Sequence, residues 1–333
     1  MLISDYVDGS RDVYRIDGSY LLLRHINGVL ACASAFFLNV LIIVSIKRLN
    51  ASSLRHFRGL LVAVSVLDIF YAFASGITSM GFEYYNEGFL IVVTGICTWG
   101  PSELSRFAYI FYIVTFNAFF ILQPVLFICR YITICLPKKV SVLKKPSVIV
   151  GGLSSAVAFC VVEVYLCAST YSLTSEHPRF EAAETGEEIF VDAQFLTSAG
   201  ADSLVLAVQS ALLNVLVLTS IGSMAYCSAR IFVFLKRNAS SFSERTRLGQ
   251  RRLTVALILQ TIVPILTGVV PLYVGFYMFF NQVALKHILW YTVLLHVWQP
   301  TISALITIAF VTPVRTAIRR LGCTPSRTFT SEF

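Results

Sequence analysis

Apolar residues gather in seven long runs, separated by shorter polar segments. A helix that crosses a membrane needs about 20 mostly apolar residues, because the hydrocarbon layer is roughly 30 Å thick and each residue rises about 1.5 Å. Since lipid offers the backbone no hydrogen-bond partners, such runs form helices. The pattern predicts membrane helices at 26–46, 59–80, 107–129, 147–170, 204–227, 253–276 and 288–311.

These runs divide the chain into an N-terminal segment (1–25), a seven-helix domain (26–312) and a tail (313–333). The fold class expected is therefore all-α, a polytopic seven-transmembrane-helix bundle. One shorter apolar stretch, 89–99, has about half the length of a span and stops at Gly100-Pro101. We expect it to form an ordered loop or short hairpin outside the membrane.

Composition and charge fix the class and the expected orientation. Of the 333 residues 56% are hydrophobic and 13% are charged, too few charges to coat a soluble protein and too much hydrophobicity for disorder. One set of loops (47–58, 130–145, 230–252 and the tail) carries 20 of the 26 Lys and Arg residues and two acids. The opposite set carries six basic and 14 acidic residues. Because positive loops stay in the cytosol, the N-terminus is expected outside and the C-terminus inside.

The net charge of +8 is thus a topology signal, and no nucleic-acid partner is expected. Glycosylation acts on segments outside the cytosol. The two glycosylation sequons, at Asn50 and Asn238, fall on the predicted cytosolic side, so we expect them to be unused.

Polar residues inside the spans form a first group of candidates. Asn39 and Asp68 lie at similar depth in the first and second helices, and Gln299-Pro300 is comparably deep in the seventh. A buried carboxylate is costly in a membrane and is expected to face the bundle interior. Two interpretations are open: a switch site that holds a cation or a proton, or a protonated Asp that joins helices.

A second group consists of two prolines in the sixth helix and the cytosolic end of the third helix. Pro264 and Pro271 kink the sixth helix, which makes it either a moving part or a static bend. Arg130, followed by Tyr131, ends the third helix, where it either reaches a partner or anchors the interface. Spacing alone favours the anchor, because the preceding residue is Cys129 rather than an acid.

Aromatic residues gather in the third, sixth and seventh helices, in the halves that are expected to lie toward the outside of the cell. Positions 109, 112, 116, 120 and 123 share one face of the third helix. Such residues line a ligand pocket or form an aromatic belt, and we assign Tyr109, Tyr277 and Tyr291 to the belt. Glu163, in the fourth helix, either lines the cavity or pairs structurally. The residues assigned to a pocket are Tyr112, Phe116, Phe120, Glu163, Tyr273 and His296.

The eight cysteines show no metal-binding spacing. Cys97 and Cys167 either form a disulfide between two external segments or remain unpaired, with Cys167 in the core. Cys323 follows Arg319-Arg320 and is either an acylation site or a plain thiol. No enzyme signature occurs, so neither catalysis nor a cofactor is expected.

Four segments resemble the nematode serpentine chemoreceptors of the Str superfamily, a group of G protein-coupled receptors. They are LRHFRGLLVAVSVLDIFYAF, FICRYITIC, RRLTVALILQTIVPILTGVVP and QPTISALITIAFVTPVR. The resemblance spans about 28–320 and is closest to the srd or str class. It implies an odorant-type receptor that binds a small chemical ligand, signals to a heterotrimeric G protein and sits in the plasma membrane, in the cilia of chemosensory neurons.

The resemblance also implies roles for single residues. Arg130 and the basic segment 245–252, with Arg251 and Arg252, would face the G protein. Asp68 would match the acidic position of helix two, and Gln299-Pro300 the polar-proline step of helix seven. Two departures stand out: Cys129 replaces the acid of the rhodopsin-type triplet, and Ser303 stands where a tyrosine is expected.

The alternative function is a transporter or ligand-gated channel for a small solute. Insect-type odorant channels have the opposite orientation to the one that the loop charges indicate. A transporter would favour inverted repeats and more charge within the membrane.

Overall fold

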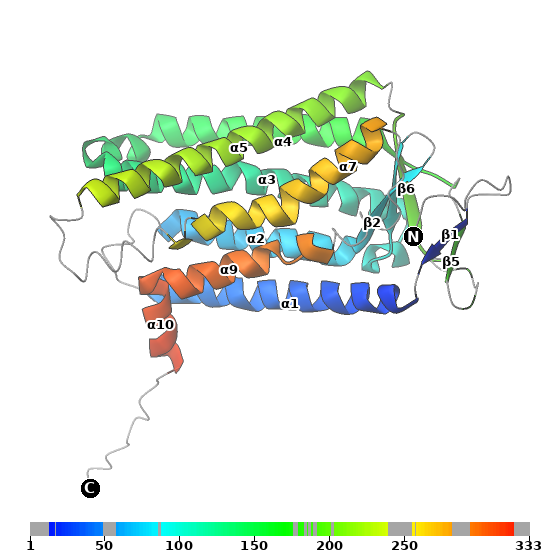
Figure 1. Ribbon diagram of the computed structural model, residues 1–333, viewed down its shortest axis with the longest axis horizontal. Helices are drawn as coiled ribbons and strands as arrows, with labels where there is room; N and C mark the ends of the chain where they lie inside the picture. The colour runs from blue at the N-terminus through cyan, green and yellow to red at the C-terminus, as the bar shows by residue number, and fades with distance from the viewer. Residues whose placement is uncertain are drawn as a thin grey trace, which may run out of the picture.

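The computed structural model describes residues 13–16, 18–48, 58–85, 88–175, 179–182, 185, 188, 192–200, 203–238, 255–256, 258–281 and 294–322. Six of its helices are long and apolar enough to cross a membrane, and the shorter apolar helix Leu294–Phe310 completes a bundle of seven. The helices run along the long axis of the molecule (Figure 1). The prediction of a seven-helix membrane bundle is confirmed.

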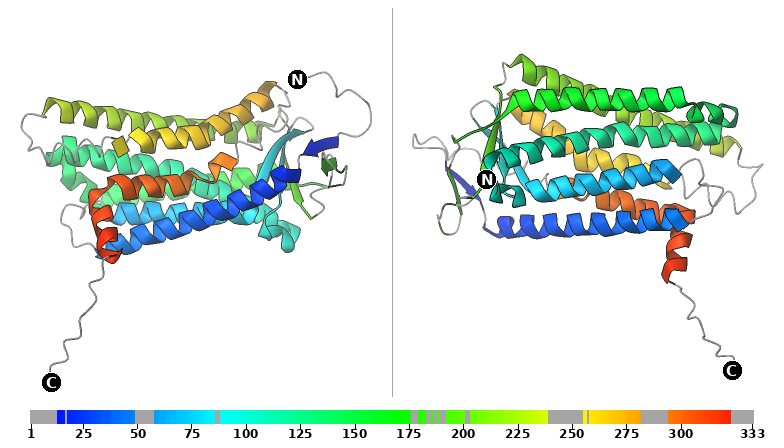
Figure 2. Two further views of the ribbon diagram at one scale, coloured as in Figure 1. Left: turned by 60° about the horizontal axis from the view of Figure 1, so that its bottom comes forward. Right: turned by 180° about the vertical axis from the view of Figure 1, so that it is seen from behind.

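The first five helices are continuous: α1 (Gly18–Arg48), α2 (Arg58–Thr78), α3 (Ser102–Cys135), α4 (Pro146–Thr170) and α5 (Leu204–Arg237). The sixth helix, 258–281, contains a single π-helical turn, η5 (Ile265–Val269), followed by α7 (Val270–Asn281). The seventh contains α9 (Gln299–Phe310). The last helix, α10 (Thr312–Gly322), turns away from the bundle (Figures 1 and 2).

Three helices are about ten residues longer than the apolar runs indicate. The α1 helix has 31 residues and begins eight residues before its run. Both α3 and α5 have 34 residues, and each continues well past the last residue of its apolar run. The extra turns of α5 end in Lys236 and Arg237, whose side chains can reach water while the backbone stays helical. Charge marks where the hydrocarbon layer ends, not where hydrogen bonding along the helix ends.

Packing differs sharply between α3 and α4. The α3 helix runs through the centre of the bundle and buries side chains along most of its length, from Ser105 to Arg130. The α4 helix lies at the edge and buries only Glu163, Leu166, Cys167 and Thr170. Because most of its apolar surface faces outward, toward lipid in a membrane, the burial of one acid on it is a specific feature.

A small antiparallel sheet covers the end of the bundle opposite α10 (Figure 2). Its strand order is β2 (Met80–Tyr85), β3 (Gly88–Val93), β6 (Gln194–Ser198) and β4 (Tyr171–Leu173). A separate parallel pair joins β1 (Val13–Ile16) to β5 (Arg179–Ala182). We refer to this end as the sheet end and to the other as the α10 end.

The sheet partly corrects the purely helical expectation. The stretch 89–99 is the hairpin strand β3 and the short helix η2 (Ile96–Trp99), as the expectation of a loop or hairpin allowed. The strands β4 and β6 come from the segment between α4 and α5, which the sequence pattern left without structure. Pairing between these strands satisfies the backbone N–H and C=O groups at the sheet end of the bundle.

Gly95 attaches the hairpin to α2. Its backbone N–H donates to the carbonyl oxygen of Thr78 at 3.0 Å. A Cβ atom at this position would lie 2.0 Å from the backbone oxygen of Ile77. Only glycine allows the two backbones to approach this closely.

Candidate functional site

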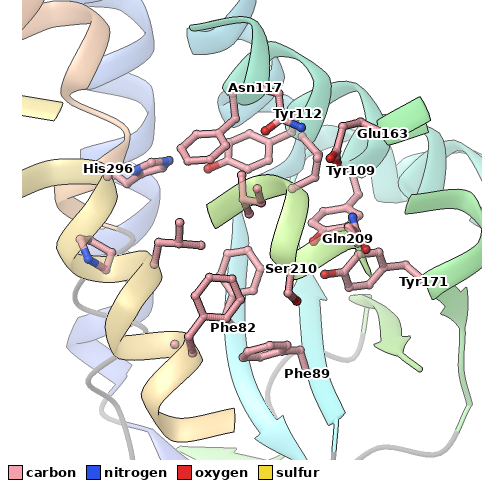
Figure 3. A pocket seen from close by; sticks show the side chains of 18 of the residues that line it. Phe82, Phe89, Tyr109, Tyr112, Asn117, Glu163, Tyr171, Gln209, Ser210 and His296 are labelled. Carbon is pink, nitrogen blue, oxygen red and sulfur yellow. The ribbon is translucent and has the colours of Figure 1, made fainter. Parts of the chain in front are cut away.

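A cavity of about 160 Å³ lies between the helices, immediately beneath the sheet (Figure 3). Its walls come from α3, α4, α5 and the sixth and seventh helices, and β2, β3 and β4 close it from the sheet end. Aromatic side chains make up much of the lining. They are Phe82, Phe89, Tyr109, Tyr112, Phe116, Tyr171 and Phe276.

Four of the six residues assigned to a pocket line this cavity: Tyr112, Phe116, Glu163 and His296. Phe120 does not. It lies one turn deeper on α3, fully buried, with its ring centroid 4.9 Å from that of Phe116. It supports the cavity from below.

Tyr273 lies outside the cavity, which corrects its assignment to the pocket. The α7 helix contributes Pro271, Leu272, Gly275 and Phe276 to the lining. These positions share one helical face, and Tyr273 points away from it with 37% of its surface exposed.

Tyr109 is corrected in the opposite direction. We assigned it to the aromatic belt, yet it is buried and lines the cavity. Its ring packs edge-on against Tyr171 of β4, with centroids 4.9 Å apart. Burial raises the pKa of Tyr171 well above its ordinary value, so this phenol remains neutral. The helical spacing 109–112–116 contained the signal, but the covering strand that buries Tyr109 did not show in the sequence.

One wall of the cavity is polar. It consists of Glu163 from α4, Asn117 from α3 and Gln209 from α5, all of them buried. Figure 3 shows Glu163 and Gln209 on the side opposite His296. The Gln209 amide nitrogen donates to the sulfur of Cys167 at 2.8 Å. Asn117 and Gln209 lay within apolar runs and were not recognised from the sequence.

Cys97 and Cys167 are both free thiols, so the disulfide considered for them is absent from the structure. Cys97 is buried in η2, where burial raises the pKa of its thiol. Cys167 faces the polar wall instead of the sheet. Each thiol therefore fills a separate place in the core, and the sheet is fastened by backbone pairing.

The opposite wall depends on a proline. Pro271 has no N–H to donate to the carbonyl oxygen of Thr267, four residues earlier. His296 makes this bond instead, with its Nδ1 2.7 Å from the Thr267 oxygen. Because a carbonyl oxygen only accepts, Nδ1 carries the hydrogen and Nε2 of the neutral ring is left as an acceptor. The kinked sixth helix and the seventh helix are thereby joined at the cavity.

Polar contacts continue below this point toward the α10 end. The Thr267 hydroxyl lies 3.3 Å from Oε1 of Gln299. Nearer the α10 end, the Arg130 guanidinium donates to Oε1 of Gln260 at 3.0 Å, and the Gln260 amide donates to Thr307 at 3.4 Å. Arg130 is thus buried against the sixth helix. This does not fit the interpretation of Arg130 as an anchor at the membrane interface.

The remaining predicted residues divide as follows. Asp68 is buried and hydrogen-bonded with Ser303 of α9, which links the second and seventh helices. Asn39 donates to Ala35 of its own helix at 2.9 Å.

Tyr131 packs edge-on against Tyr226 of α5. Pro264 directly precedes the π turn, and Pro300 is buried in the first turn of α9.

Three predicted residues cannot be placed. Arg251, Arg252 and Cys323 lie outside the described residues. Their roles stay predictions.

A larger groove, about 830 Å³, runs between α1, α2 and the start of the seventh helix. Its walls include exposed Phe70, Phe73 and Trp99 at the surface of the bundle. In a membrane, lipid chains would cover such a surface. The cavity beneath the sheet, which is lined by side chains from five helices and three strands, is therefore the better candidate for a ligand site.

Comparison with protein families agrees with this architecture. A family model described as "Serpentine type 7TM GPCR chemoreceptor Str" matches residues 24–319, which include most of α1, the other six helices of the bundle and the whole cavity lining. Comparison with curated proteins gave no match. The chain therefore belongs to the Str family of serpentine seven-transmembrane G protein-coupled chemoreceptors.

Proposed function

We propose that this chemoreceptor binds a small molecule in the cavity beneath the sheet and transmits binding to a heterotrimeric G protein at the α10 end. The observation that carries the proposal is that the sixth helix belongs to both places. It lines the cavity through Gly268, Pro271 and Leu272 and holds Arg130 through Gln260. A ligand that repositions this helix changes the surroundings of Arg130.

The sheet end faces the outside in this proposal. Basic residues concentrate at the opposite end, where Lys47, Arg48, Lys236 and Arg237 close α1 and α5. The loop charges of the whole sequence point the same way. The receptor sits in the plasma membrane, and by family resemblance in the cilia of chemosensory neurons.

The π turn gives the sixth helix a mechanism for moving. It lies between Pro264 and Pro271, two positions at which the backbone ladder lacks a donor. Single π turns are frequent at functional sites, because adding or removing one residue from a turn rotates everything beyond it. A ligand can shift this equilibrium only by its difference in affinity for the two arrangements.

Replacing Gln260 with leucine is expected to raise ligand-independent signalling. The substitution keeps the volume but removes the bonds to Arg130 and Thr307. Bonds to charged groups contribute about 1.5–3 kcal/mol. The arrangement in which the sixth helix holds Arg130 therefore loses about tenfold or more in population relative to the arrangement in which the helix has moved away. Basal nucleotide exchange on a co-expressed G protein measures this.

Asn214→Leu is the matched control, because this amide donates to Ser210 of its own helix. It should leave basal exchange unchanged. Equal basal rates in wild type and Gln260→Leu, at equal surface level, would show that this contact does not restrain the receptor.

The orientation has its own test. Asn238, the residue after α5, begins a glycosylation sequon at the α10 end. In the proposed orientation this end is cytosolic, so glycosidase treatment should leave the mobility of receptor from eukaryotic cells unchanged. A sequon engineered next to β1 should gain a glycan and is the positive control. A glycan on Asn238 would reverse the orientation.

A further inference from the structure

The polar wall of the cavity contains more hydrogen-bond acceptors than the protein uses. The side chain of Asn117 faces the Glu163 carboxyl. Within the part of the chain that the structure describes, however, no partner meets both the distance and the angle of a hydrogen bond at Oε1 of Glu163, Oε1 of Gln209 or either polar atom of the Asn117 amide. All three side chains line the cavity, and Glu163 is only 1% exposed. Three of these four atoms are oxygens. Since burying an unpaired polar atom is costly, the arrangement favours a ligand that brings donors.

The charge of the wall points in the same direction. Among the described residues, the ion pair found is Arg106 with Glu103, near the start of α3, and no Lys or Arg pairs with Glu163. A buried carboxylate without a counter-charge is destabilising. A cationic ligand would supply the missing charge.

The aromatic lining favours a cation as well. Tyr109, Tyr112, Phe116 and Tyr171 share the cavity with Glu163. The faces of aromatic rings attract cations, and the attraction is strongest where water is excluded. The same rings provide the apolar contact that a small organic body needs.

We propose that the cavity selects small ammonium compounds, with the charged nitrogen at the wall of Glu163, Asn117 and Gln209 and the apolar body toward Phe116 and His296. This assignment rests on the proposed function, because it names the ligand class of the same cavity. A primary ammonium group offers three N–H donors to the three free oxygens. An anionic ligand would be repelled by Glu163, and a ketone would bring only an acceptor.

Thermal unfolding of the full-length receptor in detergent tests this without any G protein. The probes share one scaffold and differ in the polar group: 2-phenylethylamine, 2-phenylethanol, 4-phenyl-2-butanone and 3-phenylpropionic acid, with n-butylamine and n-hexylamine as aliphatic amines. We expect at least one amine to raise the melting temperature in a concentration-dependent manner. The alcohol should bind at least about tenfold more weakly, and the acid and the ketone should have no effect.

Glu163→Gln is the decisive variant, because it keeps the shape of the side chain and removes its charge. We expect it to weaken amine binding about 30-fold or more, as for removal of one partner of a buried charge pair. Binding of the alcohol should change less than about threefold. Glu103→Gln, which removes a 72% exposed acid on α3, is the matched control and should bind amines like wild type.

The outcomes separate the two proposals. Amine-dependent stabilisation that Glu163→Gln abolishes, without any nucleotide exchange, would support the ligand class and contradict G protein signalling. Signalling driven by the ketone or the acid, or amine binding that Glu163→Gln leaves intact, would overturn the ligand class and keep the receptor function. A melting temperature that no amine shifts would also overturn it.

Discussion

Replacing Arg130 with alanine is expected to reduce ligand-dependent nucleotide exchange by about tenfold or more while the receptor still reaches the cell surface. Arg130 is buried near the α10 end of α3 and donates to Gln260 of the sixth helix. In the proposed mechanism the sixth helix moves away, so that the guanidinium loses this partner and becomes available to an inserted helix of the G protein. Its five donors and permanent charge suit the carbonyl oxygens at the end of such a helix.

The loss of nucleotide exchange in Arg130→Ala must come from the position of Arg130 and not from the change in net charge. Arg237→Ala removes one positive charge from the end of α5, where the side chain is exposed, and should signal within about twofold of wild type. Surface level is measured in parallel with an epitope at the N-terminus. Normal exchange by Arg130→Ala at normal surface level would remove Arg130 from the mechanism. Arg130→Ala should lower ligand-stimulated exchange, and Gln260→Leu should raise basal exchange. Finding both effects would show that the contact between these two side chains restrains the receptor.

The second large effect is expected from Gly95→Ala, which should greatly reduce the amount of folded receptor. The added Cβ would lie 2.0 Å from the backbone oxygen of Ile77 and 2.7 Å from the backbone carbon of Thr78. Neither can rotate away, so the hairpin must shift from the end of α2. Forcing an atom into packed structure costs about 1–3 kcal/mol, and more where backbone must move. Melting temperature in detergent and surface level both measure this loss.

Gly28→Ala provides the control, since nothing lies within 4 Å of a Cβ at that position of α1. Alanine in a helix is favoured over glycine by roughly 0.5–1 kcal/mol, so this variant should be at least as stable as wild type. If Gly95→Ala melts and reaches the surface like Gly28→Ala, the hairpin does not rest on α2 as described.

The helices of this receptor could be predicted from the sequence because lipid imposes one simple rule. Each span must be long, apolar and internally hydrogen-bonded, and each of these requirements leaves a mark on the local sequence. The third helix could even be assigned a face, because Tyr112 and Phe116 follow its regular spacing into the cavity.

The sixth helix could not be assigned a face from the sequence, because the helix is irregular, and Tyr273 was assigned to the pocket from its depth alone. The π turn at Ile265–Val269 adds a residue to one turn and rotates the rest of the sixth helix by about 100° relative to a uniform helix. Tyr273 lies beyond that turn, and its side chain points outward instead of into the cavity. The sequence marks the prolines on either side but not the extra residue.

The sheet is the other part that local patterns could not predict. Its strands are short, and β3 pairs with β6, about one hundred residues later. Such pairing depends on tertiary geometry, so Tyr171 and Phe89 could not be assigned to the cavity. The sheet also covers Tyr109, which explains why this residue is buried although it lies close to the end of its helix.

The polar wall was hidden for a related reason. Asn117 and Gln209 lie within apolar runs, where an amide most often joins helices. Only the packing of α3, α4 and α5 brings them beside Glu163. Sequence therefore identified the acid, and the structure identified its neighbours.

The central claim is that a molecule bound beneath the sheet controls a G protein at the opposite end. Its most direct test is nucleotide exchange on purified heterotrimeric G proteins by the receptor in lipid nanodiscs, with compounds that raise its melting temperature. The account predicts that such a compound accelerates exchange by wild type and not by Arg130→Ala. Ligand-evoked current in receptor-only bilayers, with no acceleration of exchange, would contradict it.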